Sequence, residues 1–237
     1  MDMRDYLNFD GVLSSDYNVF ISGSYTYVRP ERDKTFASVP GRSGDLIYDN
    51  GRYKNVVIQY PALIRKDFPD LHEGFSNEVL KRTSYQRLTD TYHPDEFRLA
   101  IPTGALKPTT GVNNVSGKFT IEFNCKPQRY LIIGETPVTF TAAGAINNPC
   151  KMDSKPLIRV YGSGTIGLNN GTLTIGAHGY PYMDIDCELQ DAHYGAINLN
   201  SYLTMSWDEY PVLHEGENQI TLSGVTSIEI TPRWWRL

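Results

Sequence analysis

Hydrophobic and polar residues alternate along much of the chain, and a period of two predicts β-strands. In residues 182–190, apolar side chains occupy every second position and carboxylates occupy several of the positions between them. That pattern predicts an antiparallel strand with one buried face and one solvated face. Further strands are predicted at a spacing typical of a β-sandwich, over residues 157–161, 165–168, 172–175, 218–222 and 227–230.

One segment has a helical period instead. Leu71, Phe75 and Val79 recur every four residues, which places them on one face of a helix. Asp70 stands just before them and is a favourable N-cap residue. We therefore predict a single α-helix over residues 70–83.

After the helix, alternating residues on both sides of a turn predict a long antiparallel hairpin over residues 85–102. His93, Pro94 and Asp95 form the turn. The same tripeptide occurs in J-domain co-chaperones between two helices, but here both flanking segments have the pattern of strands. A tight turn is therefore the better interpretation.

The net charge and the residue composition differ between the two parts of the chain, which predicts two domains. Residues 1–130 carry 17 basic and 16 acidic side chains, whereas residues 131–237 carry 5 basic and 11 acidic ones. The change falls in a stretch rich in Gly, Asn and Pro between about residues 130 and 150. We predict a mainly β chain with domains at 1–138 and 139–237, the first containing the helix and the hairpin.

Composition and charge exclude several classes of protein. Hydrophobic residues make up 40% of the chain and charged residues 21%, which fits a globular protein and not a disordered one. A net charge of −5 argues against binding nucleic acid through clustered Lys and Arg. The most apolar stretch, residues 56–64, is shorter than the ~20 residues of a membrane span. We expect neither specific nucleic-acid binding nor membrane insertion.

The cysteines and the N-terminal residues indicate where the protein is made. Cys125, Cys150 and Cys187 form no C-x-x-C pair, and their odd number does not suggest a disulfide framework. The first residues lack the basic and apolar regions of a secretion signal. We expect reduced thiols in a chain synthesised in the cytoplasm.

No group of residues predicts catalysis, a cofactor or a metal site. The sequence lacks G-x-S-x-G and H-E-x-x-H, so no nucleophile, base and orienting group can be proposed together. Residues 162–167 match G-x-G-x-x-G, but a predicted hairpin follows them where dinucleotide binding needs a helix. Asp184, Asp186 and Glu188 resemble a solvated strand face more than a calcium loop. We expect a protein that is not an enzyme.

The tryptophans leave two interpretations open. Trp207, Trp234 and Trp235 could stack on sugar rings, or they could anchor a core and an interface. The acidic strand face around Asp184 and Asp186 offers no stacking aromatic residue between its carboxylates. We therefore expect that the second domain does not bind simple sugars measurably.

Several strings of residues resemble, in order, those of the distal tail (Dit) proteins of siphophages that infect Gram-positive bacteria. The resemblance covers essentially the whole chain. The strings are SVPGRSGDL at 38–46, GRY at 51–53, DTYHPDEFR at 90–98, KFTIEFNCKPQRY at 118–130, SKPLIRVYGSG at 154–164, YMDIDCELQD at 182–191 and IEITPRWWRL at 228–237.

The resemblance implies a structural role in a virion. Distal tail proteins form hexameric rings at the distal end of a long non-contractile tail, and they are synthesised in the bacterial host cytoplasm. The ring joins the tail tube protein to the tail-associated tip protein and to receptor-binding or baseplate proteins. The first domain is then a ring-forming β-sandwich with one helix and a long hairpin. The second is a peripheral galectin-like β-sandwich.

A ring requires a contact between two different surfaces of neighbouring copies. The 85–102 hairpin has no bulge or interior proline to shield its edges, so we expect it to lie on a neighbouring copy. The predicted interface residues are Tyr85, Arg87, Tyr92, Phe97 and Leu99. DNA passes through such a ring, and the missing basic stripe is consistent with that passage. The alternative is a carbohydrate-binding module that aids host adhesion.

Overall fold

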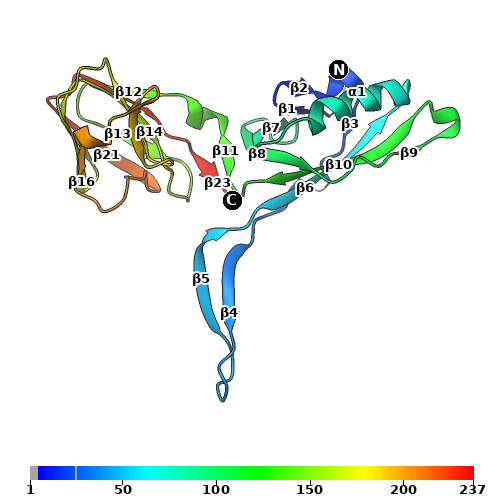
Figure 1. Cartoon of the computed structure of the whole chain (residues 1–237), viewed down its shortest axis with the longest axis horizontal. Coiled ribbons are helices and arrows are strands. Elements are labelled where there is room, and N and C mark those ends of the chain that lie inside the picture. Colours follow the sequence, from blue (N-terminus) through cyan, green and yellow to red (C-terminus); the bar gives the residue numbers. More distant parts are fainter. Residues whose placement is uncertain (1–4, 25) are drawn as a thin grey trace. The chain divides into compact units, whose positions relative to one another are not determined.

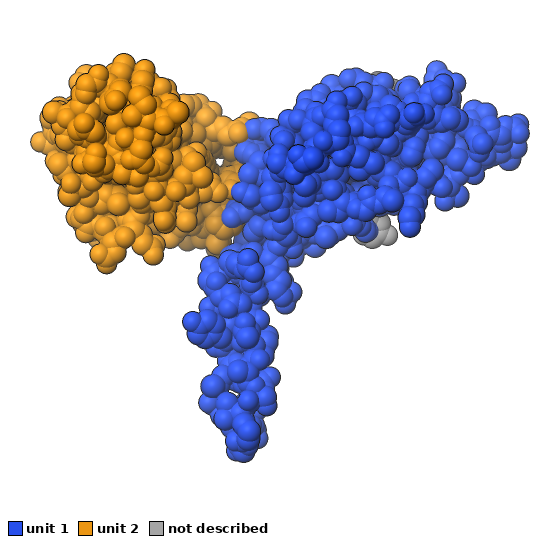
Figure 2. All heavy atoms as spheres, viewed as in Figure 1, with its two compact units in different colours: residues 1–129, 237 blue, residues 130–236 orange. Residues whose placement is uncertain are grey.

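The structure of the chain is a computed structural model, which describes residues 5–24 and 26–237. The chain is mainly β, as the alternation of its residues predicted. It divides into two compact units, coloured separately in Figure 2. Unit 1 comprises the described residues up to Arg129 together with Leu237, and unit 2 comprises residues 130–236.

Unit 1 is built on an antiparallel sheet with the strand order β2-β1-β7-β8-β10-β6-β3, beside which β9 pairs with β10 (Figure 1). Its strands and helices are β1 (Leu7–Phe9), β2 (Val12–Leu13), η1 (Ser14–Tyr17), β3 (Phe20–Ile21), β4 (Arg32–Ala37), β5 (Leu46–Tyr53), β6 (Val56–Ile64), α1 (Phe68–Leu80), β7 (Gln86–Asp90), β8 (Glu96–Thr103), β9 (Thr109–Thr110), η2 (Val112–Asn114) and β10 (Gly117–Cys125).

The centre of this sheet is the pair formed by β6 and β10, whose residues are in register along the full length of both strands. Alternate residues of each strand are buried, so one face of the pair lies on the core and the other is more exposed. Aromatic rings fill much of that core. The ring of Phe123 lies 4.9 Å from that of Phe9 and 6.1 Å from that of Tyr60.

The predicted helix is present as α1, the one α-helix in the described part of the chain, but its bounds differ from 70–83. It begins earlier because Pro69 occupies the first turn, where proline needs no hydrogen-bond partner. Asp67, with φ of 54°, is the N-cap residue, and the predicted cap Asp70 lies within the first turn. The buried face consists of Phe68, Phe75 and Val79.

The predicted 85–102 hairpin is present as the antiparallel pair of β7 and β8. Its edges, however, are not free. Strand β7 also pairs with β1, and β8 also pairs with β10, so both strands lie inside the sheet. The expectation of an unpaired edge was therefore wrong. Strand β1 is only three residues long, and its alternation was too short to predict that it would cover β7.

The long exposed hairpin of unit 1 is formed by other strands. Strands β4 and β5 pair only with each other, as a two-stranded sheet that extends away from the main sheet (Figure 1). We call residues 32–53 the arm. Its base is closed by a hydrogen bond from the backbone N–H of Lys54 to the carbonyl oxygen of Glu31, at 2.9 Å. Two residues later the chain enters β6.

Unit 2 is a sandwich of two antiparallel sheets, with orders β12-β22-β14-β17-β18-β19 and β13-β21-β15-β16-β20. Its elements are β11 (Arg129–Leu131), whose first residue belongs to unit 1, η3 (Ile132–Glu135), β12 (Val138–Phe140), β13 (Gly144–Asn148), β14 (Leu157–Tyr161), β15 (Gly164–Leu168), β16 (Gly171–Ile175), β17 (Met183–Asp186), β18 (Asp191–Tyr194), β19 (Ile197–Asn198), η4 (Asn200–Tyr202), β20 (Leu203–Met205), β21 (Gly216–Ser223), β22 (Ser227–Thr231) and β23 (Trp235–Arg236).

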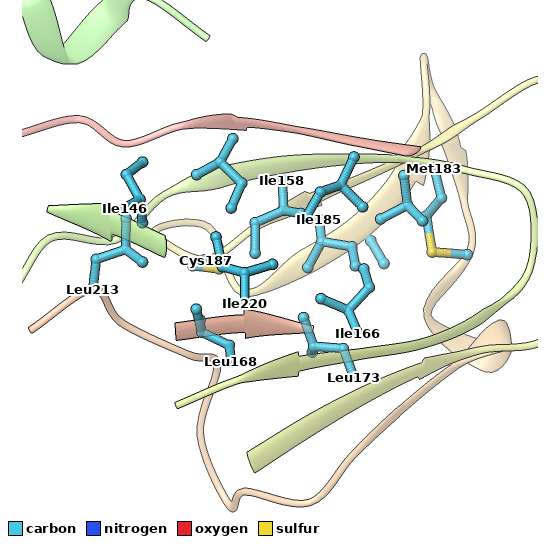
Figure 3. Close-up of a cluster of buried hydrophobic side chains, with 14 of the residues drawn as sticks. Ile146, Ile158, Ile166, Leu168, Leu173, Met183, Ile185, Cys187, Leu213 and Ile220 are labelled. Carbon is cyan, nitrogen blue, oxygen red and sulfur yellow. The ribbon is translucent and has the colours of Figure 1, made fainter. Parts of the chain in front are cut away.

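The core of unit 2 lies between these sheets and is mostly aliphatic (Figure 3). Ile158 and Ile185 come from one sheet, and Ile166 and Leu173 come from the other. All of the strands expected from sequence between residues 157 and 175, and between 218 and 230, are present. The glycines at 162–167 lie at the start of the β15–β16 hairpin, as predicted, and no helix follows them.

The two units meet in sequence between Arg129 and Tyr130, whereas the sequence placed the domain boundary at 138/139. The residues after 130 belong to unit 2 because they pack on its last segment. The backbone N–H of Leu131 donates to the carbonyl of Trp234 at 2.8 Å. A Cβ on Gly134 would stand 2.5 Å from the nitrogen of Trp234, so only glycine allows this close approach.

Strand β17 differs from the half-solvated strand predicted for residues 182–190. It ends at Asp186, and all four of its residues are buried. Two arginines make this burial tolerable. Arg159 donates to both carboxylate oxygens of Asp184, at 2.7 and 2.9 Å, and Arg233 donates to both oxygens of Asp186, at 2.8 Å each. Paired carboxylates can enter an interior that unpaired ones cannot.

The pair of Asp186 and Arg233 predicts how the stability of unit 2 depends on pH. Burial opposes ionisation of Asp186, but hydrogen bonds from Arg233 and from backbone N–H groups outweigh it and lower its pKa below the ordinary 3.8. Ionised Asp186 therefore contributes stability above pH ~4, and this contribution is lost as pH falls through the lower folded value. We expect Asp186→Asn to lower the free energy of unfolding by about 2 kcal/mol at pH 7.

The measurement is urea unfolding followed by tryptophan emission, because all three tryptophans lie in unit 2. The gap between wild type and Asp186→Asn should be smaller at pH 3 than at pH 7. Glu188→Gln is the control, since Glu188 lies 3.8 Å from Arg233 but its side chain is 41% exposed. A gap that stays constant with pH would contradict this assignment.

The three cysteines are buried thiols, Cys125 in unit 1 and Cys150 and Cys187 in unit 2. Burial raises the pKa of Cys125 and of Cys187 to about 12. Their sulfur atoms serve as small apolar groups in the two cores.

Candidate assembly surface

The arm is a regular hairpin for most of its length. Phe36 lies opposite Ile47, and Thr35 lies opposite Tyr48. The connection, residues 38–45, contains Gly41 and Gly44 with φ of 78° and 83°, which other residues rarely adopt. This turn falls within SVPGRSGDL, one of the strings that carry the sequence resemblance.

Charged residues fix the part of the arm nearest the sheet. Arg32 pairs with Asp49 at 2.9 Å and lies over the ring of Tyr53, and Arg52 pairs with Asp33 at 2.7 Å. The hydrogen bond from Arg32 lowers the pKa of Asp49, and the one from Arg52 lowers that of Asp33. Exposed pairs of this kind stabilise little, so their main effect is to fix the register of the two strands.

Beyond these pairs, both strands of the arm carry large apolar side chains that are exposed to solvent, and we call this part the apolar half of the arm. The exposed fractions are 61% for Phe36, 63% for Ile47, 72% for Tyr48 and 45% for Leu46. A two-stranded hairpin without a covered face is only marginally stable in water. Contiguous exposed apolar side chains on a soluble protein mark a surface that contacts another molecule. The apolar half of the arm is therefore the best candidate for an assembly contact in unit 1.

A second candidate surface is a groove at the β3 edge of the main sheet. It has a volume of about 750 Å³ and lies where the short edge strand β3 meets β6 and β10. Phe20, Pro61 and Leu63 supply half-buried apolar side chains. Lys107 and Lys118 stand among the other lining residues. The groove is large enough to take several side chains of a partner.

The interface residues predicted from sequence occupy a different place. Arg87 lies on β7 with its guanidinium 3.9 Å from the centre of the Phe97 ring on β8, and Phe97 is buried. Leu99 is half-buried on β8, and Tyr85, just before β7, is 39% exposed. These four residues lie together across the β7–β8 pair. Their assignment to a contact between copies stays a prediction. The free strand edge on which that prediction was based is absent, because β7 and β8 are both paired inside the sheet.

Tyr92 lies apart from the other four, in the turn between β7 and β8. Its hydroxyl donates to Asp5 at 2.7 Å, and desolvation together with that bond raises its pKa to about 12. The ring lies against Gly23, where a Cβ would come within 2.8 Å of it. This tyrosine therefore joins the turn to the N-terminal part of unit 1.

Sequence reasoning missed the arm residues Phe36, Ile47 and Tyr48, although a signal was present. Two apolar stretches flank a Pro-Gly and Ser-Gly turn at 38–45, which is the pattern of a hairpin. The string Asp49-Asn50-Gly51 is also typical of a tight turn, which masks that hairpin pattern. In the structure these residues lie within β5, where Gly51, with φ of 72°, changes the course of the strand without reversing it.

The described residues hold no group of three or more His, Cys, Asp or Glu side chains placed to bind a metal ion. None of the helices in the described ranges is long and apolar enough to cross a membrane. Asp184 and Asp186, once candidates for a solvated acidic face, are both engaged by arginines.

Fold and surface together define a class: a two-unit, mainly β protein whose first unit carries one helix and a projecting arm. No family model matches the sequence, and no curated protein matches it by sequence. Solved structures do match. The SPP1 Dit (gp 19.1) protein, described as a paradigm of hub adsorption apparatus in Gram-positive infecting phages, is 16% identical, with a TM-score of 0.75 over 98% of this chain and 99% of that one.

A chain of the phage P2 baseplate, in its activated conformation with Ca, matches less closely. It is 11% identical, with a TM-score of 0.52 over 96% of this chain and 97% of that one. The chain therefore has the fold of the SPP1 Dit protein along nearly its whole length. The resemblance to phage distal tail proteins that the sequence strings indicated is confirmed at the level of the fold.

Proposed function

We propose that this protein is a distal tail protein that forms a ring at the tip of a phage tail. The observation that carries the proposal is the exposed arm on a chain with the fold of the SPP1 Dit protein. The ring joins the tail tube protein to the tail-associated tip protein and to receptor-binding or baseplate proteins. It is hexameric, as the resemblance to the family implies, and its role is structural and not enzymatic.

Unit 1 supplies two different surfaces, which is what a ring needs. A contact between unlike patches can repeat around a rotation axis until it closes, whereas a contact between like patches stops at a dimer. The arm presents apolar side chains, and the groove beside β3 presents an apolar floor. The arm of one copy lies in the groove of the next. Unit 2 then remains available for other components of the tail tip.

The test is the mass and shape of the purified full-length protein. Light scattering should give a mass near six times the 26.8 kDa of one chain, and negative-stain images should show hollow rings. Weak contacts close into rings only above a threshold concentration, so the protein is measured over a concentration series and with the tip protein added. A strict monomer under all of these conditions would refute the proposal.

A further inference from the structure

Unit 2 contains a hollow that the assembly role does not use. Its volume is about 420 Å³, within the range of sites for small molecules. It lies between the turn that joins β15 to β16 and residues 207–214, which follow β20. The residues that line it include Asn169, Asn170, Trp207, Glu209, Tyr210 and His214.

The indole of Trp207 is held in a fixed position against this hollow. A Cβ on Gly171 would lie 1.8 Å from an indole carbon, so the ring rests on the backbone where only glycine leaves room. The preceding residue, Ser206, is bonded to β16 in both directions. Its N–H donates to the carbonyl of Thr172 at 3.0 Å, and its hydroxyl accepts from the N–H of Thr172 at 2.8 Å.

Some polar groups that line the hollow are hydrogen-bonded within the protein, and others are available to bind a ligand. Asn169 helps to build the hollow, because its amide donates to Asn218 and its carbonyl oxygen accepts from the N–H of Gln219. Within the described part of the chain, the side chains of Asn170 and Glu209 make no hydrogen bond. The ring of His214 is oriented by Asp153, 3.1 Å from its Nδ1, which leaves Nε2 available.

The three tryptophans therefore have different roles, which the sequence could not separate. Trp234 is buried in the core, with 5% of its surface exposed. Trp235 donates its indole N–H to the carbonyl of Asp153 at 2.9 Å. Trp207 alone among the three lines the hollow, half-buried, with available hydrogen-bonding groups around it.

We propose that this hollow is a binding site for a neutral pyranose sugar, either a terminal residue of a polysaccharide or a free glycoside. The apolar face of a pyranose ring stacks on an aromatic ring, and its hydroxyls both donate and accept hydrogen bonds. The hollow offers an aromatic ring for stacking and three polar groups for hydrogen bonds, which are the indole of Trp207, the amide of Asn170, the carboxylate of Glu209 and the imidazole of His214. The Glu209 carboxylate and the Asp153 carboxylate behind His214 disfavour an anionic sugar.

This proposal differs from the expectation that the second domain binds no simple sugar. That expectation rested on the strand around Asp184, where no aromatic residue was found between the carboxylates. Trp207 comes from a different part of the chain, and it is brought to Asn170 by the pairing of β16 with β20. The proposal goes beyond the ring-forming role and does not depend on it, because the ring surfaces lie in unit 1.

The experiment is saturation-transfer NMR with the full-length protein and a panel of methyl glycosides and N-acetylhexosamines, followed by titration. We expect at least one neutral sugar to bind saturably at up to about 20 mM, since a single stacked ring gives millimolar affinity. Trp207→Ala should weaken binding at least about tenfold, and Asn170→Ala or Glu209→Ala about three- to tenfold.

Glu215→Ala is the matched control, because Glu215 is an exposed carboxylate in the same segment that does not line the hollow. It should leave the affinity unchanged. Asn170 and Glu209 are also exposed, so their variants test the site even where Trp207→Ala disturbs the fold. The proposal is overturned if no neutral sugar binds saturably, if glucuronate binds as well as glucose, or if the Asn170 and Glu209 variants bind like the control.

Discussion

A chain whose arm is replaced by a short turn is expected to fold normally and to remain monomeric. The change substitutes Asn-Gly for residues 32–53, joining Glu31 to Lys54. These two residues already form a closing hydrogen-bonded pair, and Asn-Gly is the preferred two-residue hairpin turn. The arm adds almost no buried surface to unit 1, so the free energy of unfolding should change by no more than about 1 kcal/mol.

Light scattering and negative-stain imaging would compare this variant with the wild type at equal concentration. Ile47→Asp is a smaller change with the same expected result, because it places a charge in the apolar half of the arm. Leu189→Asp is its control, since Leu189 is an aliphatic residue of similar exposure in unit 2. Rings formed by the armless chain would show that the arm is not the contact, and would favour the residues of the β7–β8 pair.

Mixing two defective variants should restore exactly one contact and produce heterodimers, not rings. Ile47→Asp damages the arm and leaves the groove intact, whereas Leu63→Glu damages the groove and leaves the arm intact. In the mixture, the intact arm of the Leu63→Glu variant binds in the intact groove of the Ile47→Asp variant. The remaining arm and groove of that pair are both defective, so growth stops at twice the mass of the 26.8 kDa chain.

The measurement is analytical ultracentrifugation of each variant alone and of an equimolar mixture. Val57→Glu is the control for the groove, because Val57 lies on the same strand, is 46% exposed and does not line the groove. It should form rings as the wild type does. A mixture that stays monomeric would contradict an arm-in-groove contact, and a mixture that forms full rings would show that each substitution is tolerated.

The sequence predicted the elements whose pattern is local. The strands of unit 2 alternate cleanly and are each bounded by turns, so their positions could be read directly. The helix was also predictable from its four-residue period, although Pro69 extended its start. The resemblance to known tail proteins was carried by strings of residues and extends to the fold, even though the identity to the SPP1 Dit protein is 16%.

Features that depend on distant residues could not be predicted in this way. Asp184 and Asp186 had the pattern of a solvated face, but the arginines that neutralise them lie 25 and 47 residues away in sequence. The edges of β7 and β8 were taken as free because the strands that cover them lie elsewhere in the chain. The hollow at Trp207 likewise requires the β15–β16 turn and residues 207–214 to be brought together.

The buried thiols of the two cores have a consequence for the covalent stability of the chain. Disulfide exchange and air oxidation proceed through the thiolate, and a thiol with a pKa of about 12 is ionised only to about one part in 10⁵ at pH 7. Cys125, Cys150 and Cys187 are also shielded from oxidants by burial. The folded chain can therefore pass from reducing to oxidising surroundings with its covalent structure unchanged. The chain needs neither a reductant to protect its thiols nor an oxidant to complete its fold.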